Sequence, residues 1–512
     1  MKKNSINTLL SALVLTMTLS ACSDFLDVAP SDKQTADQLF ATKSGFYTAS
    51  NGIYDALSSD ALYGKELTWH ALDLMAYHYS PAQKSLEIQN MTSGNYTSPY
   101  VSPFIDAAWS EAYSTILAAN LLIDRVKEQE GILTEQEAAC LTGEMLGVRA
   151  YLHLDMLRLF GPVPSFGLTT PAIPYNNSSS VTVLPLLPFN EVIDNIIADL
   201  EQAQSLLEQY DPIVTEGPLA TEAEDGSSLN LRYRQYRMNY YAVKALKART
   251  YSWACDTEKA LAAALDVIND PKVQAYFPAV DPNNILANNT NPDRVFSSET
   301  FFGIYDKDRD EVFDDNFSTS SATATQLLQP YADYVTNGYG LFTLPMLSLP
   351  EMSDYRYQCQ WEQASGTGNS GFQFTKYKKI AQPDPLDEDS EYFYSHMISL
   401  MRISELYLIA AECDPVNFME YYNTERARRG VALPAGFDMY VEMYWGTYGY
   451  GNFFLQNEYC REFWGEGQMF FCLKRLPLMP GYENYVYYNM NGAEMNMDMI
   501  NPVLPLPEGE MK

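Results

Sequence analysis

Positively charged residues are scarce in this chain. Its 512 residues contain 33 Lys and Arg against 65 Asp and Glu, which gives a formal net charge of −32 at pH 7. Nucleic acid and anionic lipid surfaces are bound through clustered basic side chains that neutralise phosphate groups. The composition therefore argues against nucleic acid as a partner and favours a neutral or cationic ligand. A plainer interpretation is that the acidic surplus only keeps the protein soluble.

Cysteine and histidine are also few. The seven cysteines include no CxxC pair, which argues against a disulfide scaffold and against a zinc ribbon. The four histidines form no HExxH motif and no close triad with a cysteine. His153 falls within a predicted long helix, where a satisfied core histidine is the expected role. We therefore expect no metal and no cofactor.

Motifs of catalysis are missing as well. The chain has no G-x-S-x-G nucleophile elbow, no phosphate loop and no dinucleotide fingerprint. The short run Gly465-Glu466-Gly467 follows a predicted helix instead of opening one, so it indicates a helix stop and not a phosphate cradle. We expect the protein not to be an enzyme.

No apolar run is long enough to span a bilayer. The stretch from Leu9 to Leu19 has only eleven residues and is interrupted by Ser and Thr, whereas a membrane-spanning helix needs roughly 20 apolar residues. It follows Lys2 and Lys3 and ends in Leu19-Ser20-Ala21-Cys22, a sequence typical of a bacterial lipoprotein processing site. We predict that residues 1–21 are a signal peptide and that lipidated Cys22 anchors the mature chain. Cleavage at an ordinary A-x-A site is the alternative.

Helical periodicity dominates both ends of the chain. Apolar and small residues recur at helical spacing in seven segments. These are Trp109 to Val126, Glu135 to Phe160, Phe189 to Glu208, Met238 to Ala254, a segment that follows the turn Cys255-Asp256-Thr257 and runs to Ile268, Met401 to Cys413 and Asn417 to Arg429. Small residues such as Ala245 and Ala260 on successive helices allow two backbones to approach closely, as in a tetratricopeptide hairpin. The pattern predicts a mainly α fold built on tetratricopeptide-like helix pairs.

The middle of the chain is different. Between Val280 and Ser390 the sequence is rich in aromatic residues, Gly, Pro and Asp and has no sustained helical period, and Ser58 to Ser102 is similarly irregular. Loops on a stiff scaffold commonly carry binding function. No linker forces a split, so we expect one domain over residues 22–512. Its helical scaffold would cover about 38–275 and 395–512, with a loop-rich insert at about 280–390.

Nine sequence pieces, spread in order along the chain, resemble the family of SusD and RagB proteins. They are the lipobox with Phe25-Leu26-Asp27; Trp109, Tyr113, Ile116 and Asn120; Gly143-Glu144 through Arg149-Ala150-Tyr151 to Leu159-Phe160-Gly161-Pro162-Val163-Pro164; Asp199-Leu200-Glu201 with Ala203; Ala245-Leu246-Lys247-Ala248-Arg249; Met401 to Glu412; Arg426-Ala427-Arg428; Arg461-Glu462-Phe463 with Gly465 to Gln468 and Leu473-Lys474-Arg475; and Pro505-Leu506-Pro507 with Glu510.

The resemblance implies a function as well as a fold. Members of this family sit on the outer face of the outer membrane, bind nutrient ligands, usually glycans, and act as the lid of a SusC-like TonB-dependent transporter. We therefore expect a lipid-anchored surface protein that binds oligosaccharides. Three alternatives are peptide capture, as in RagB-type members, a surface glycoside hydrolase, and a plain tetratricopeptide interaction module.

Candidate ligand contacts come from the two irregular stretches. Sugar rings stack on Trp and Tyr, while their hydroxyls need polar partners. We select Trp69, Tyr96 and Trp361 as stacking platforms and Asn95 and Arg356 as polar partners. A position in the core or at the transporter contact is the alternative for each aromatic.

The charged residues of the family-like motifs suggest a structural role. Charges at helical spacing within apolar helices are expected to form buried pairs between helices. The residues concerned are Arg402, Glu405, Glu412, Arg461, Glu462 and Glu466. A glycosidase pair made of Glu405 and Glu466 would need an open cleft between the two carboxylates, and nothing in the sequence supports one.

Overall fold

The computed structural model describes residues 36–163, 168–219, 229–287, 291–331, 335, 340–344, 349–364, 371–381, 392–436, 439, 451–475, 487–488, 494–495 and 503–510. The predicted signal peptide and Cys22 lie outside the described residues, so both remain predictions. The chain divides into two compact units, Met1–Ala49 and Ser50–Lys512. The first unit contains α2 (Ala36–Leu39), and helix α3 (Lys43–Leu57) begins in it.

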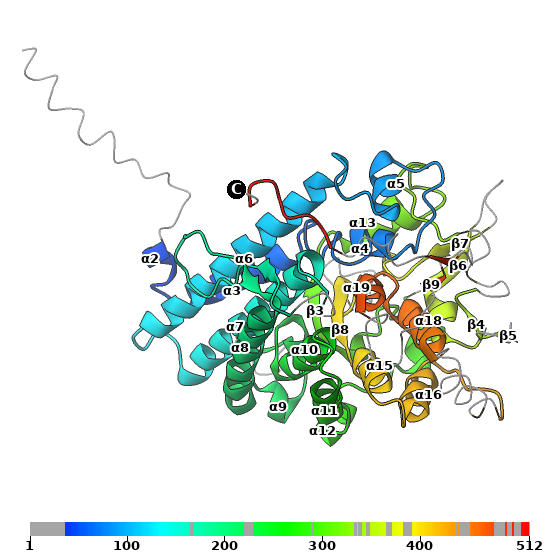
Figure 1. Cartoon of the computed structure of the whole chain (residues 1–512). Coiled ribbons are helices and arrows are strands. Elements are labelled where there is room, and N and C mark those ends of the chain that lie inside the picture. The colour runs from blue at the N-terminus through cyan, green and yellow to red at the C-terminus, as the bar shows by residue number, and fades with distance from the viewer. Residues whose placement is uncertain are drawn as a thin grey trace, which may run out of the picture. The chain divides into compact units, whose positions relative to one another are not determined.

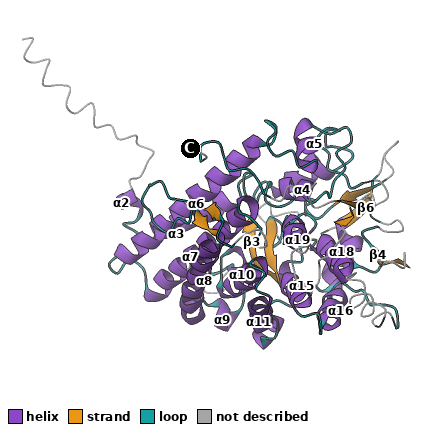
Figure 2. Cartoon of the chain, in the orientation of Figure 1, coloured by secondary structure: helices purple, strands orange, loops and turns teal. Residues whose placement is uncertain are grey.

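The larger unit is mainly α-helical, as predicted (Figures 1 and 2). Its α-helices are α4 (Ala71–Met75), α5 (Leu86–Thr92), α6 (Ser102–Glu128), α7 (Glu135–Phe160), α8 (Phe189–Tyr210), α9 (Ile213–Glu216), α10 (Tyr240–Trp253), α11 (Thr257–Ile268), α12 (Pro271–Tyr276), α13 (Arg309–Val312), α14 (Tyr355–Gln360), α15 (Ile403–Cys413), α16 (Phe418–Arg428), α18 (Gly451–Phe463) and α19 (Gln468–Arg475). Short 3-10 turns lie at Leu229–Leu231, Arg234–Tyr236 and Ser297–Glu299, and π-turns at Asn283–Ala287 and Phe313–Phe317. No described helix is both long and apolar enough to cross a membrane.

The long helices pack in sequence against one another. Helix α6 packs on α7, α7 on α8, α8 on α10, α10 on α11, α11 on α15 and α15 on α16 (Figure 1). Close approach between α7 and α8 depends on Gly143, because a Cβ atom there would lie 2.7 Å from the Leu207 side chain. Ala260 and Ala264 of α11 are fully buried, as the small-residue pattern predicts. This arrangement confirms the helix-pair scaffold.

Local signals set the ends of helix α7. Thr134 and Glu137 form a capping box, in which each side chain bonds the other residue's backbone N–H. The helix ends at Phe160, directly before Gly161 and Pro162, so its bounds are those predicted from the sequence. Its middle is buried on every side, since it lies between α6 and α8.

The strands are short and antiparallel. The described residues form the pairs β1 (Pro171–Ile173) with β2 (Leu187–Pro188), β3 (Thr300–Tyr305) with β8 (Met397–Arg402), β4 (Thr343–Leu344) with β5 (Leu349–Pro350), β6 (Trp361–Gln363) with β7 (Phe372–Phe374), and β9 (Tyr487–Tyr488) with β10 (Glu494–Met495). The prediction of a helix starting at Met401 was wrong by two residues. Met401 and Arg402 pair with β3, so helix α15 begins at Ile403.

The described part of the middle segment contains only short helices and strands, as predicted. Its aromatic residues are used mostly for packing. Side chains with at most 1% exposure include Phe301, Phe302, Phe317, Phe342, Phe374 and Tyr377. Most aromatic residues of this segment therefore belong to the hydrophobic core.

Candidate functional site

The three predicted stacking residues lie in the interior. Trp69 is 3%, Tyr96 2% and Trp361 5% exposed. The indole N–H of Trp69 donates a 2.8 Å hydrogen bond to the Gly64 carbonyl. Trp361, on β6, meets Trp464 edge to face with ring centroids 5.0 Å apart. Burial favours the core alternative for these rings, and contact with a ligand stays a prediction.

The two predicted polar partners occupy opposite environments. Arg356 is fully buried and its guanidinium bonds Asp354 at 2.6 and 2.9 Å, Glu458 at 2.6 Å and Glu462 at 2.8 Å. Such a side chain has little capacity left for a ligand hydroxyl. Asn95 is exposed, and its amide donates to the Asn90 side chain at 2.7 Å. Asn95 thus keeps access to solvent, as a polar ligand contact requires.

Arg356 belongs to a buried cluster of charged residues, here called the Arg–Glu cluster. It joins the 3-10 turn Ser297–Glu299, strand β8, helices α14, α16 and α18, and the segment that follows β5. Its members are Glu299, Glu351, Asp354, Arg356, Lys376, Arg402, Glu425, Arg426, Arg428, Arg429, Glu458, Arg461, Glu462 and Glu466. The ion pairs of this cluster therefore connect the loop-rich middle segment with the C-terminal helices.

Burial and ion pairing have opposite effects on the pKa values of the carboxylates in this cluster. Burial would raise the pKa of Glu458, but the nearby charges of Arg356, Arg426 and Arg461 outweigh burial and lower it to about 2. The pKa of Glu462 is likewise held well below its usual value, mainly by Arg429 and Arg402. Both carboxylates therefore stay ionised inside the protein, as structural ion pairs require.

The charged residues of the family-like motifs are scaffold, as predicted. Glu405 binds Arg249 through two contacts of 2.7 and 2.6 Å, and Glu412 binds Arg475 at 2.8 and 2.5 Å. Glu466 pairs with Arg402 at 2.8 Å and with Lys376. Glu405 and Glu466 are 6% and 3% exposed. Carboxylates buried in ion pairs in this way do not suit a glycosidase pair, which has to face the substrate across an open cleft.

The fold brings one histidine against a cysteine and a carboxylate, a contact that no sequence motif indicates. His78 Nε2 lies 3.6 Å from Cys460 Sγ, and His78 Nδ1 lies 3.2 Å from an Asp73 carboxylate oxygen. Burial lowers the pKa of His78, but Asp73 and Cys460 outweigh it and raise this pKa to about 10. Asp73 and His78 have no exposed surface and Cys460 is 3% exposed, so a substrate cannot reach the thiol. His78 and Cys460 are 382 positions apart in the sequence, so sequence reasoning could not predict this contact.

Other sequence-based expectations are confirmed. His153 is fully buried, with Nδ1 2.9 Å from the Arg149 carbonyl and Nε2 accepting the Asn176 N–H at 3.0 Å. Burial lowers its pKa to about 3, so it stays neutral.

The six cysteines from Cys140 to Cys472 are free thiols. Gly465 and Gly467 follow α18 with φ of +82° and +70°, which confirms the helix stop.

Sequence reasoning missed a group of partly exposed aromatic residues, here called the Tyr305 group: Tyr233, Tyr236, Tyr305 and Phe393. Tyr305 ends strand β3 and is 47% exposed. The Tyr236 ring lies 5.9 Å from Tyr305 and 5.0 Å from Phe393, and Phe393 stacks on Tyr233 at 6.2 Å. These rings offer flat apolar area at the surface, which suits the C–H face of a sugar.

The Tyr305 group has only a weak signal in the sequence. Tyr305 closes a strand whose other residues are all buried, so its position at the strand end is the one available clue. Tyr236 and Phe393 are separated by more than a hundred residues, and the hydrogen bond from the Tyr236 hydroxyl to the Phe393 carbonyl at 2.6 Å forms only in the folded chain.

Comparison with known proteins gives the same family in each case. Residues 24–216 match the SusD-like family described as "Starch-binding associating with outer membrane". SusD-like protein P2 of Formosa agariphila is 28% identical over 203 residues, which are 38% of this chain and 37% of that protein. The chain thus matches little more than a third of this relative's length.

Solved structures share the fold along most of the chain. A SusD superfamily protein from Bacteroides vulgatus superposes with a TM-score of 0.60 and 21% identity over 92% of this chain and 96% of its own. A protein of the same organism described as a SusD-like carbohydrate binding protein gives a TM-score of 0.58 and 18% identity over 85% of this chain and 83% of its own. These similarities confirm the resemblance to SusD-like proteins, in sequence over residues 24–216 and in fold along most of the chain.

Proposed function

We propose that this protein binds nutrient oligosaccharides at the cell surface and delivers them to a SusC-like TonB-dependent transporter, acting as its lid. The match of residues 24–216 to a family described as starch-binding and associated with the outer membrane carries this proposal. The carbohydrate-binding description of a structural relative agrees with it. In this proposal residues 22–512 work as one domain.

The Tyr305 group is our first choice for the ligand contact. Its rings are partly exposed, whereas those of Trp69, Tyr96 and Trp361 are buried. A neutral sugar would stack on Tyr305 without any charge on the ligand, which suits a protein of net charge −32. Asn95 is a separate polar candidate, because it too is exposed.

We further propose that binding occurs without catalysis. The carboxylates Glu405 and Glu466 are buried in ion pairs, and the thiol of Cys460 is shielded from solvent. A hydrolase needs an acid and a second carboxylate facing the substrate. A binding protein needs neither.

The ligand class can be tested on a glycan array with the full-length chain carrying Cys22→Ala, which prevents lipidation. We expect retention of at least one neutral oligosaccharide, weakened by Tyr305→Ala. Peptide capture is the second candidate, and the acidic composition would favour cationic peptides. Retention of such peptides with no glycan bound would replace the sugar proposal with this one.

The anchor and the partner need separate tests. We propose that lipid chains on Cys22 hold the protein on the outer membrane. Cys22→Ala should move the protein from the membrane fraction to the soluble fraction, or block its maturation. Wild-type protein extracted from native membranes in mild detergent should bring down a large TonB-dependent barrel, and recovery as a free monomer would count against the lid role.

A further inference from the structure

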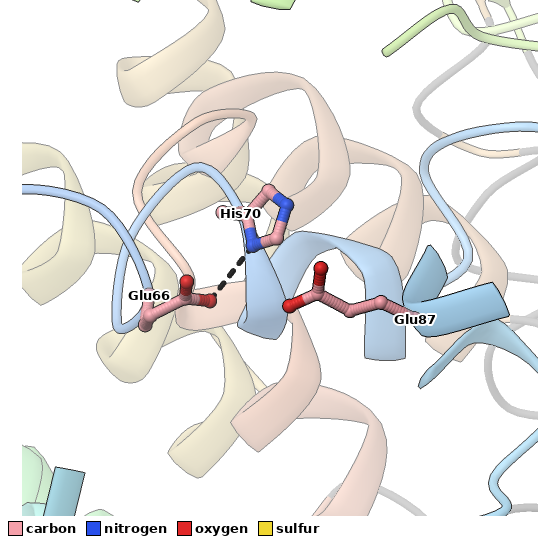
Figure 3. A group of neighbouring side chains, drawn as sticks. All are labelled: Glu66, His70 and Glu87. Carbon is pink, nitrogen blue, oxygen red and sulfur yellow. Dashed lines mark hydrogen bonds and ion pairs between the residues drawn. The ribbon is translucent and has the colours of Figure 1, made fainter. Parts of the chain in front are cut away.

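Three side chains that have no role in the proposed function converge in a way that suits a metal ion. They are Glu66, His70 and Glu87, and one donor atom of each lies within 4.8 Å of the other two. Figure 3 shows the Glu87 carboxylate pointing towards the His70 ring and the Glu66 carboxylate. We propose that Glu66, His70 and Glu87 form a binding site for one Zn²⁺ ion.

Two separate chain segments build this site. Glu66 and His70 lie on the turns that lead into α4, and the hydrogen bond between them shows that their side chains face the same side. Glu87 is in the first turn of α5, and α4 and α5 pack against each other. The start of helix α5 is also bound to a distant part of the chain, because the Ser85 N–H donates a 3.0 Å hydrogen bond to the Thr325 carbonyl. The packed segments thus pre-position all three donors.

The donor set has the chemistry of a zinc site. An imidazole nitrogen and two carboxylates are ligands that Zn²⁺ accepts at about 2.0 to 2.2 Å, which separates neighbouring donors by roughly 3.4 Å in a tetrahedron. The His70 Nδ1 to Glu66 Oε2 distance is 2.7 Å, so the bound ion would take the place of the proton shared by these atoms. Glu66 is 8% and His70 6% exposed, whereas Glu87 is partly exposed. The ion would enter from the Glu87 side and keep a water as its fourth ligand.

Charge at the site is compatible with a divalent cation. Lys65 lies 3.1 Å from Glu66 Oε1, the oxygen that does not face His70. One ammonium beside two carboxylates leaves a negative charge for the ion to neutralise. Glu87 also acts electrostatically on the Lys65 ammonium but has no hydrogen bond or ion pair within the described part of the chain, so the ion would give that carboxylate a direct partner.

Metal uptake by the full-length chain tests the proposal. After chelator treatment, the wild type should bind one Zn²⁺ per chain in a calorimetric titration, and Co²⁺ should give the visible absorption of a site with nitrogen and oxygen ligands. His70→Ala and Glu87→Gln should each weaken Zn²⁺ binding at least tenfold. Zn²⁺ should raise the melting temperature of the wild type but not that of Glu87→Gln.

Two variants serve as matched controls. His396→Ala removes a histidine outside the site, one that is partly exposed, and Glu258→Gln removes an exposed carboxylate that, like Glu87, lies in the first turn of a helix, α11. Both should bind Zn²⁺ within about twofold of the wild type. Because Glu87 is partly exposed, Glu87→Gln is expected to fold even if His70→Ala does not. No uptake by the wild type, or equal affinity of the wild type and Glu87→Gln, would overturn the proposal.

Discussion

Replacement of Trp361 by alanine separates a core role of this side chain from a ligand-binding role. Trp361 is 5% exposed and packs on Trp464 and on Phe374, with ring centroids 5.0 and 5.1 Å away. Removing a buried Trp side chain costs about 3 to 5 kcal/mol. An unfolding entropy of about 2.1 cal/mol/K per residue amounts to roughly 1 kcal/mol/K for a chain of this length, so the melting temperature should fall by about 3 to 5 °C.

The assay is thermal unfolding followed by circular dichroism, with sugar affinity measured below the transition. Tyr305→Ala is the matched control, because Tyr305 is 47% exposed and its loss should cost less than about 1 kcal/mol of stability. If the Tyr305 ring stacks on a sugar, its loss should weaken affinity by about 1 to 3 kcal/mol. An unchanged melting temperature for Trp361→Ala, together with a large loss of affinity, would refute the core assignment.

Further predictions concern the Arg–Glu cluster and the stop of helix α18. The pKa of Glu458 in the folded state, about 2, is below its ordinary value of 4.5, so its ionised form stabilises the fold above pH 4.5 and this contribution is lost as the pH falls towards 2. Glu458→Gln should therefore lower the free energy of unfolding by about 3 kcal/mol at pH 7. Urea titrations should show that the difference in unfolding free energy between wild type and variant becomes smaller at low pH, and a difference that stays constant with pH would contradict the ion-pair explanation. Gly465→Ala should cost about 1 to 3 kcal/mol, since its φ is +82° and its new Cβ would lie 2.8 Å from the Phe374 ring. Equal melting temperatures for the wild type and this variant would show that the turn tolerates a side chain.

The helical scaffold could be predicted because its signals are local. Helix α7 has a capping box at Thr134, continuous small and apolar residues, and a Gly-Pro stop after Phe160, all readable within one segment. Strand β8 could not be separated from helix α15, because Met401 is a good helix former and only its pairing with β3 makes it part of a strand. Local periodicity does not contain that information.

The side chains of the candidate site were harder to predict. Trp361 stands in a segment with the composition of loops, which suggested exposure, but pairing of β6 with β7 places its ring against Trp464. Arg356 resembles a polar ligand contact in sequence, yet it is surrounded by carboxylates contributed from α18. The side of the fold that a loop residue faces depends on distant partners, and a single sequence does not reveal them.

The central claim is that the protein binds a sugar without cleaving it. Its most direct test is a calorimetric titration of the full-length Cys22→Ala chain with a neutral oligosaccharide selected on the array. The expected result is saturable binding that weakens in Tyr305→Ala, with the sugar recovered intact by chromatography after long incubation. Two results would contradict the account. One is the release of reducing ends from the sugar, if substitution of a single carboxylate abolishes that release. The other is the absence of any binding heat with neutral glycans while cationic peptides bind.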